Sequence, residues 1–278
     1  MTPVAADVSR RLRSVAVRAA WTSATYLKGV FRTDMRVEAK GNPFDLVTEH
    51  DAASEELLRR VIFEDEPDST VRGEEGGAVG TGAITWHVDP IDGTVNFASG
   101  IAFWCVSVAA EVDGLVVAGA IVDPMSGMEF SVDVDGFRVD GELRTRRAAA
   151  ADENGATVIC TFPRFLDLEA NGEEALSAAG ELARRMGSVR AMGSGALGLA
   201  HVAAGWADAT FDMHTNPWDV AAGALMVRAT QGHYVGFEHG APDADPRTSF
   251  RRRSYYAVGP GGRYPTLESV VQRLSATA

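Results

Sequence analysis

Residues 86 to 97 read Trp86-His87-Val88-Asp89-Pro90-Ile91-Asp92-Gly93-Thr94-Val95-Asn96-Phe97. The apolar residues before Asp89 predict a strand over residues 84–88, which Pro90 ends because proline has no backbone donor for a sheet. Gly93 permits a tight turn and a close approach of the backbone to a ligand. Asp89, Asp92 and a free carbonyl supply the oxygen ligands that hard cations such as Mg²⁺ prefer. The stretch therefore predicts a cation site at a strand end, and the alternative is an ordinary Asp-Pro and Asp-Gly turn.

Further acidic residues lie outside this stretch, at Asp51, Glu74-Glu75 and Asp219. Loops carry most catalytic chemistry, so acidic residues at strand ends and turns are the first candidates. The amides expected around Gly93 and Thr94 are able to receive phosphate oxygens, especially where a helical turn begins. The combination predicts a site that binds a divalent cation and phosphate oxygens together.

The chain has 278 residues and a formal net charge of −12. This length suits one large α/β domain or two closely packed halves, and the charge argues against a broad basic surface for nucleic acid. No apolar run approaches the roughly 20 residues that a membrane span needs, so no membrane contact is expected. Cys105 and Cys160 are the two cysteines, and both lie in apolar runs. They are expected to be buried free thiols in a cytoplasmic protein.

The first half of the chain is expected to place helices on a sheet that is mostly antiparallel. Helical periodicity covers about residues 4–31 and 51–63, and residues 72–77 are expected to form a loop. Asp113-Gly114 is a strong hairpin signal. Strands are expected on both sides of it and after it, over residues 103–112, 115–122 and 128–134.

The second half alternates more regularly between strands and helices. Strands are expected over residues 156–161, 209–213, 234–237 and 255–258. Helices are expected over residues 173–186, 194–204, 217–230 and 265–274. We therefore predict an N-terminal α+β half, residues 1–145, with most of the metal ligands. A C-terminal α/β half, residues 146–278, would carry the substrate contacts and the last metal ligand.

Residues 86–97 resemble the signature of the inositol monophosphatases. The other motifs of that family occur in the same order, as Asp45-Leu46-Val47-Thr48-Glu49-His50-Asp51, Gly73-Glu74-Glu75 and Asn216-Pro217-Trp218-Asp219-Val220-Ala221-Ala222-Gly223. The resemblance spans about residues 40–232 and is specific for the superfamily, not for a substrate. It implies the layered αβαβα sandwich of the inositol monophosphatase and fructose bisphosphatase type. It also implies a homodimer and a lithium-sensitive activity that depends on Mg²⁺, with Mn²⁺ as an alternative metal.

The resemblance assigns metal ligands among the acidic residues. Glu74, Asp89 and the backbone carbonyl of Ile91 would hold one ion. Asp89, Asp92 and Asp219 would hold a second, and Glu74 would help to bind a third, more labile ion. Metal ions lower the pKa of bound water and neutralise phosphate charge, so the chemistry requires no covalent phosphoenzyme.

The same resemblance assigns catalytic and substrate-binding roles. Asp51 and Thr94 would orient and deprotonate the attacking water, and Glu74 is counted with them as catalytic. Asp212 would accept hydrogen bonds from the hydroxyls of a sugar or polyol, or from an amine. The full set of implied substrate contacts is Asp92, Gly93, Thr94, Gly193, Ser194, Gly195 and Asp212.

Members of this family dephosphorylate inositol phosphates, histidinol phosphate, fructose bisphosphate and phosphorylated nucleotides. Inositol monophosphate is our first expectation, and histidinol phosphate or another sugar, aminosugar or nucleotide phosphate is the alternative. Residues 135–147 depart from the family pattern, whose turn at this place is richer in glycine.

Three other classes of protein compete with this interpretation. Haloacid-dehalogenase-type phosphatases use an aspartyl nucleophile and a second Asp two residues later, whereas Asp89 and Asp92 are three apart. Residues 193–198 match the dinucleotide pattern G-x-G-x-x-G, which would indicate an NAD-dependent oxidoreductase. A noncatalytic regulatory binding protein on the same fold is the third alternative, although the complete acidic motifs favour an enzyme.

Overall fold

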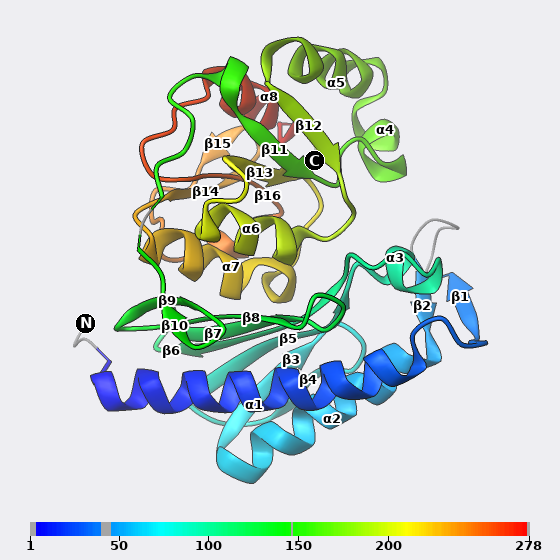
Figure 1. Ribbon diagram of the computed structural model, residues 1–278, viewed down its shortest axis with the longest axis vertical. Helices are drawn as coiled ribbons and strands as arrows, with labels where there is room; N and C mark the ends of the chain where they lie inside the picture. The colour runs from blue at the N-terminus through cyan, green and yellow to red at the C-terminus, as the bar shows by residue number, and fades with distance from the viewer. Residues whose placement is uncertain (1–3, 40–45, 146, 277–278) are drawn as a thin grey trace.

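The computed structural model describes residues 4–39, 46–145 and 147–276. Figure 1 shows helices and sheets stacked in five alternating layers along the long axis of the molecule. Helices α1 and α2 cover the outer face of one sheet, and α6 and α7 lie between the two sheets. Helices α5 and α8 cover the outer face of the other sheet, with α4 beside α5. The stacking confirms the expected αβαβα sandwich.

The first layer consists of α1 (Ala6–Val30) and α2 (Glu49–Asp65), as the helical periodicity predicted. The buried face of α1 packs on the first sheet, chiefly against β7. Helix α2 begins earlier than expected because Thr48 caps it. No helix in the described part of the chain is long and apolar enough to cross a membrane. A small two-stranded sheet, β1 (Val37–Ala39) with β2 (Leu46–Thr48), connects these helices.

The first sheet has eight strands in the order β10-β9-β8-β7-β6-β5-β3-β4. Only β3 and β5 pair in parallel, so the sheet is mostly antiparallel, as expected. Its strands are β3 (Ser69–Gly73), β4 (Gly77–Gly80), β5 (Ile84–Asp92), β6 (Cys105–Val112), β7 (Leu115–Asp123), β8 (Met128–Asp133), β9 (Gly136–Val139) and β10 (Glu142–Leu143).

Two expectations for this sheet were wrong. Strand β5 does not end at residue 88 but continues through Pro90 to Asp92, because its pairing with β6 skips between Asp89 and Asp92. Proline is tolerated at such an irregularity, where the ladder needs no donor from it. Residues 72–77 are not one loop, since Arg72 and Gly73 belong to β3 and Gly77 begins β4. Long-range pairing of β3 with β5 created a strand that local propensity did not indicate.

The atypical stretch 135–147 forms an edge hairpin of β9 and β10 in its described part, and residue 146 lies outside the described residues. Asp140 and Gly141 at the turn both have positive φ, 53° and 80°. Such backbone favours Asp-Gly and matches the twist of a two-residue hairpin. Asp135, before the hairpin, is paired with Arg10 of α1.

The second half matches the expected alternation. Its sheet has the order β12-β11-β13-β16-β14-β15, and β11 runs parallel to both of its neighbours. The strands are β11 (Thr157–Cys160), β12 (Ser188–Ala191), β13 (Ala209–Asp212), β14 (His233–Glu238), β15 (Ala241–Pro242) and β16 (Ser254–Val258). The helices are α4 (Phe165–Asn171), α5 (Glu173–Arg185), α6 (Gly195–Ala204), α7 (Pro217–Ala229) and α8 (Pro265–Leu274), with 3₁₀ turns at Glu153–Gly155 and Ser249–Arg251. The division into halves at residue 145 stays a prediction.

One hydrophobic cluster unites the first sheet with the middle helices. Ile121 and Phe130 of the first sheet share it with Leu199 of α6 and Val220 of α7. The two helices cross very closely, because a Cβ added to Gly223 would lie 2.4 Å from the Cβ of Leu199. Both cysteines are buried and free, as expected.

We expect Gly223→Ala to destabilise the protein. Overpacking a tight core costs about 1–3 kcal/mol. The new methyl group would clash with the Cβ of Leu199, which is bonded directly to the backbone and cannot rotate away. Urea unfolding measures the change. Gly29→Ala on α1 is the matched control, since a Cβ there meets nothing within 4 Å and alanine favours the helix. Equal losses of stability in the two variants would contradict the packing argument.

Candidate functional site

The structure gathers the predicted acidic residues where several helices begin. Asp89 and Asp92 lie at the end of β5, and Glu74 follows β3 in the turn to β4. Asp51 lies in the first turn of α2, and Asp219 lies in the first turn of α7. Sequence positions from 51 to 219 thus meet in one region.

These carboxylates repel one another in a buried setting. Burial raises the pKa of Asp89 well above its usual value, and the charges of Glu74, Asp92, Asp219 and Asp51 raise it further. Burial also raises the pKa of Asp219 well above normal, against a lowering contribution from the N–H of Asn216. No basic side chain is among the leading influences on either pKa. The oxygen donors of these buried carboxylates suit a hard divalent cation such as Mg²⁺.

The acidic side chains lie in one region but do not converge on a single metal position. In the described residues, no three Asp, Glu, His or Cys side chains form a ready set of metal ligands. One oxygen of Asp89 accepts from the Ile91 N–H at 2.9 Å, and one oxygen of Asp219 accepts from the Asn216 N–H at 2.8 Å. Like charges repel strongly where the dielectric is low, and a cation between them would offset that repulsion. The donor chemistry of these residues therefore fits the metal.

Asp51 and Thr94 lie together, as the proposed water site requires. Thr48 donates to Asp51 Oδ2 through its N–H and its hydroxyl, at 2.8 and 2.6 Å. The Thr94 hydroxyl lies 3.4 Å from Asp51 Oδ1 and donates to the Ile91 carbonyl at 2.9 Å. The first residue of this motif, Asp45, lies outside the described residues. The capping box of α2 thus fixes the orientation of Asp51.

Asp92 is held by the first turn of α6. The Ser194 hydroxyl and the Ala196 N–H donate to Asp92 Oδ2, the latter at 2.9 Å, and the Cys105 thiol approaches the same oxygen at 3.6 Å. Burial raises the pKa of Asp92, and these donors lower it in part. Ser194, expected to contact substrate, is therefore engaged with Asp92. The carboxylate also fills the helix terminus that a dinucleotide pyrophosphate would need, which argues against the oxidoreductase.

Asn96 clamps this junction, a role that the sequence did not reveal. Its side-chain amide donates to the carbonyls of Phe103 and Met192, at 2.8 and 2.7 Å. Gly93 has a left-handed φ of 97°, and a Cβ there would lie 3.1 Å from the Gly193 carbonyl. Glycine is thus required both by the backbone conformation and by the close approach of the two segments.

Glu55 of α2 positions the Glu74 turn and was also missed. Its carboxylate accepts from the N–H groups of Glu75 and Gly76, at 2.8 and 2.9 Å, and is paired with Arg59. A Cβ on Gly73 would lie 2.2 Å from that carboxylate. Gly73, which precedes Glu74-Glu75, was the one signal of this contact in the sequence. A glycine there indicates that another group lies close to the backbone, but the sequence alone does not identify that group.

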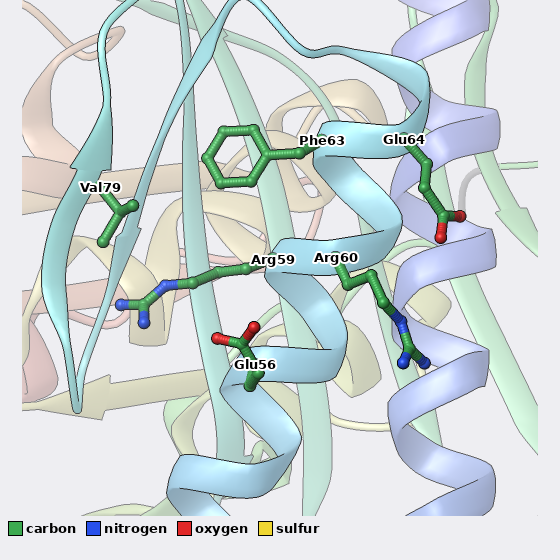
Figure 2. A pocket seen from close by; sticks show the side chains of 6 residues that line it. All are labelled: Glu56, Arg59, Arg60, Phe63, Glu64 and Val79. Atoms are coloured by element: carbon green, nitrogen blue, oxygen red, sulfur yellow. The ribbon is translucent and has the colours of Figure 1, made fainter.

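A separate cavity of about 450 Å³ lies between α2 and the β3–β4 hairpin (Figure 2). In this view Arg59 extends from α2 toward the strand that carries Val79. The lining residues are Glu56, Arg59, Arg60, Phe63, Glu64 and Val79. None of the predicted site residues lines it, so this cavity is distinct from the carboxylate region.

Asp212 reaches the same region from the second sheet. It lies near Gly195, because a Cβ there would be 3.8 Å from Asp212 Oδ2. Its two oxygens already accept hydrogen bonds from protein groups: Thr161 donates to Oδ2, and the Met213 N–H and Arg164 donate to Oδ1. Asp212 is thus adjacent to the site, but buried and paired with Arg164 at 3.0 Å.

The family model described as the inositol monophosphatase family matches residues 9–268. An inositol-1-monophosphatase of Mycobacterium leprae is 37% identical over 235 residues, covering 78% of this chain and 80% of that protein. The protein named Nus factor SuhB of Pasteurella multocida is 33% identical over 235 residues, covering 82% of this chain and 85% of that protein. The crystal structure of extragenic suppressor protein suhB from Bartonella henselae has a TM-score of 0.80 at 25% identity, covering 94% of this chain and 97% of that one. The likeness thus includes nearly the whole fold.

We expect Asp89→Asn to reduce the loss of stability with rising pH in the absence of divalent cations. The raised pKa of Asp89 means that the folded chain holds the proton more tightly than the unfolded chain. Stability from this group is therefore greatest at low pH and falls as pH rises above about 4. Asparagine carries no charge and keeps an acceptor for the Ile91 N–H.

Denaturant unfolding in excess chelator, at about pH 5 and about pH 8, tests this expectation. The wild type should lose more stability than Asp89→Asn over that interval, because only the wild type must ionise a buried carboxyl group at this position. Asp68→Asn, at an exposed position, should behave like the wild type. Identical pH dependence in all three proteins would contradict the buried-charge argument.

Proposed function

The chain belongs to the inositol monophosphatase family, and from this premise we propose that it is a magnesium-dependent phosphomonoesterase of small phosphorylated metabolites. The observation that carries the proposal is the group of buried carboxylates around Asp89. Burial and the neighbouring carboxylates raise the pKa of Asp89, and no basic side chain is among the leading causes of that shift. Burying such charges is costly unless a ligand compensates them. A divalent cation and a phosphate would together supply that compensation.

In this proposal, Glu74, Asp89 and the Ile91 carbonyl hold one Mg²⁺, and Asp89, Asp92 and Asp219 hold a second. Glu74 also contributes to a third, labile site. When bound, the metal ions neutralise phosphate charge and lower the pKa of a water molecule. The proposal allows Mn²⁺ to substitute and lithium to inhibit.

The chain's own residues would then handle the proton. Thr94 already lies beside Asp51, and Asp51 is oriented by Thr48. We assign Thr94 and Asp51 to hold the attacking water and to accept its proton while the oxygen bonds to phosphorus and the ester bond breaks. Glu74 supports them from the turn that Glu55 fixes. Backbone amides at Gly93 and Thr94, with the Gly193–Gly195 segment, would contact the substrate.

Inositol monophosphate is the first candidate substrate, supported by the name of the Mycobacterium leprae relative. Histidinol phosphate and other sugar, aminosugar or nucleotide phosphates are the alternatives. A homodimer is proposed as the assembly. A regulatory binding role is a second candidate function, because the Pasteurella multocida relative is named a Nus factor. Activity and a regulatory role are compatible in one chain.

We expect phosphate release to require Mg²⁺. Removing the metal leaves the buried carboxylates uncompensated and the attacking water unactivated. The assay measures phosphate release from inositol phosphates, histidinol phosphate, fructose bisphosphate and nucleotide phosphates after chelation and after Mg²⁺ is added back. High Ca²⁺ should inhibit, because its looser coordination misplaces the water. Full activity in persistent excess chelator would refute metal dependence.

We expect Thr94→Ala to lower kcat by about 10²–10⁴-fold, the usual range for a group that positions or removes a proton. The apparent Mg²⁺ affinity should change little, because Thr94 supplies none of the proposed metal ligands. Thr33→Ala, at an exposed position in the loop after α1, is the matched control and should retain wild-type kcat. A wild-type kcat for Thr94→Ala would remove Thr94 from the water site.

A further inference from the structure

Arg164 forms the outer part of a charged pair beside the carboxylate region. It precedes α4, and its Nη2 donates to Asp212 Oδ1 at 3.0 Å and approaches the His214 carbonyl at 3.4 Å. Asp212 also accepts from the Met213 N–H and from the Thr161 hydroxyl. Both oxygens of Asp212 are therefore occupied by protein donors, so its capacity to accept from a substrate is largely used.

The Arg164 side chain is more exposed to solvent than the Asp212 side chain, so a ligand reaches the arginine more easily. The Asp212 side chain is 5% exposed, whereas that of Arg164 is 36% exposed. In addition, Arg164 Nε is a buried donor with no hydrogen-bond partner in the described structure. Arg164 is thus the more accessible member of the pair, and its hydrogen-bonding capacity is not fully used within the protein.

The pair lies against the reaction region. Asp212 is beside Gly195 at the start of α6, the helix whose first turn holds Asp92. Asp212 is the main cause of a raised pKa at Arg164, and Asp167 and Asp219 contribute to the same shift. Asp219 is one of the proposed metal ligands, so the guanidinium lies within electrostatic reach of the phosphate site.

We infer that Arg164 reads the alcohol part of the phosphoester and selects leaving groups that present oxygen acceptors, such as hydroxyls, over those with an ammonium group near the ester. This inference rests on the proposed phosphatase function and replaces the expectation that Asp212 accepts directly from the substrate. A guanidinium has several donors in a fixed plane and no acceptor, so it matches hydroxyl, carboxylate or phosphate oxygens. An ammonium would face both a like charge and an acceptor, Asp212, that is already occupied.

Two of the candidate substrates differ in this property. Inositol 1-phosphate presents hydroxyl oxygens beside the ester, whereas histidinol phosphate carries an ammonium group there. The wild type should hydrolyse inositol 1-phosphate with a kcat/KM at least about tenfold above that for histidinol phosphate. This comparison needs no variant, and equal values for the two esters would overturn the inference.

Arg164→Gln tests the residue itself, because it removes the charge and keeps a donor. The ratio of kcat/KM for inositol 1-phosphate over histidinol phosphate should fall by about tenfold, mainly through KM. Arg164→Lys keeps the positive charge but loses the planar set of guanidinium donors. It should therefore preserve most of the discrimination against the ammonium group. Arg184→Gln, at an exposed site on α5, should leave the ratio unchanged. Denaturant unfolding of each variant reports whether the fold is retained.

A folded Arg164→Gln with an unchanged ratio would show that Arg164 only neutralises Asp212, and the inference would fall. Hydrolysis of 4-nitrophenyl phosphate separates this result from failure of the underlying function. Wild-type protein that cleaves this ester with Mg²⁺ but shows no arginine-dependent preference contradicts the inference alone. Protein that cleaves none of the three esters contradicts both.

Discussion

The bond between Asp92 and the first turn of α6 is the contact on which the geometry of the site depends. Asp92 ends β5, and its donors Ser194 and Ala196 lie more than a hundred residues later in the chain. The contact fixes the middle helix layer against the end of a strand from the first sheet. Because α6 and α7 are packed tightly together, the first turn of α7, with Asp219, is fixed in the same frame. Together with the hydrophobic cluster that α6 and α7 share, this one buried carboxylate fixes the end of β5 relative to the first turns of α6 and α7.

In the described part of the chain, carboxylates that support the structure are paired with arginines, whereas three of those in the centre of the candidate site are not. Glu55 is paired with Arg59, and Asp212 is paired with Arg164. Among the described residues, no ion pair reaches Asp89, Asp92 or Asp219. The chain thus neutralises the carboxylates that position its loops and leaves those at the centre with raised pKa values. Repulsion between these buried carboxylates lowers the stability of the metal-free fold. A bound cation would relieve the same repulsion, so the free energy that destabilises the metal-free protein also favours cation binding.

Local signals in the sequence predicted most of the elements and pointed to the acidic residues that the fold brings together. The Asp113-Gly114 hairpin and the amphipathic α1 follow from turn chemistry and from periodicity, which need no distant partner. Strand β3 was missed because its pairing with β5 is a long-range property. Glu55 and Asn96 were missed for the same reason, since their roles are defined by the backbone groups they contact across the fold. A glycine such as Gly73 signals that something lies close, and only the fold identifies it as Glu55.

The pairing of Asp212 with Arg164 has a consequence for how specificity arises on this fold. In the proposed site, the residues assigned to the phosphate come from short motifs, and their chemistry suits any phosphomonoester. The side assigned to the alcohol would be built differently, by a carboxylate at the end of β13 and a guanidinium that precedes α4, 48 positions away. Pairing occupies part of the acceptor and leaves the donor partly exposed, so under this inference a single change at position 164 would alter the hydrogen bonding offered to the leaving group. If the inference holds, selectivity would change through the segment before α4 while the buried carboxylates of the proposed metal site stay in place.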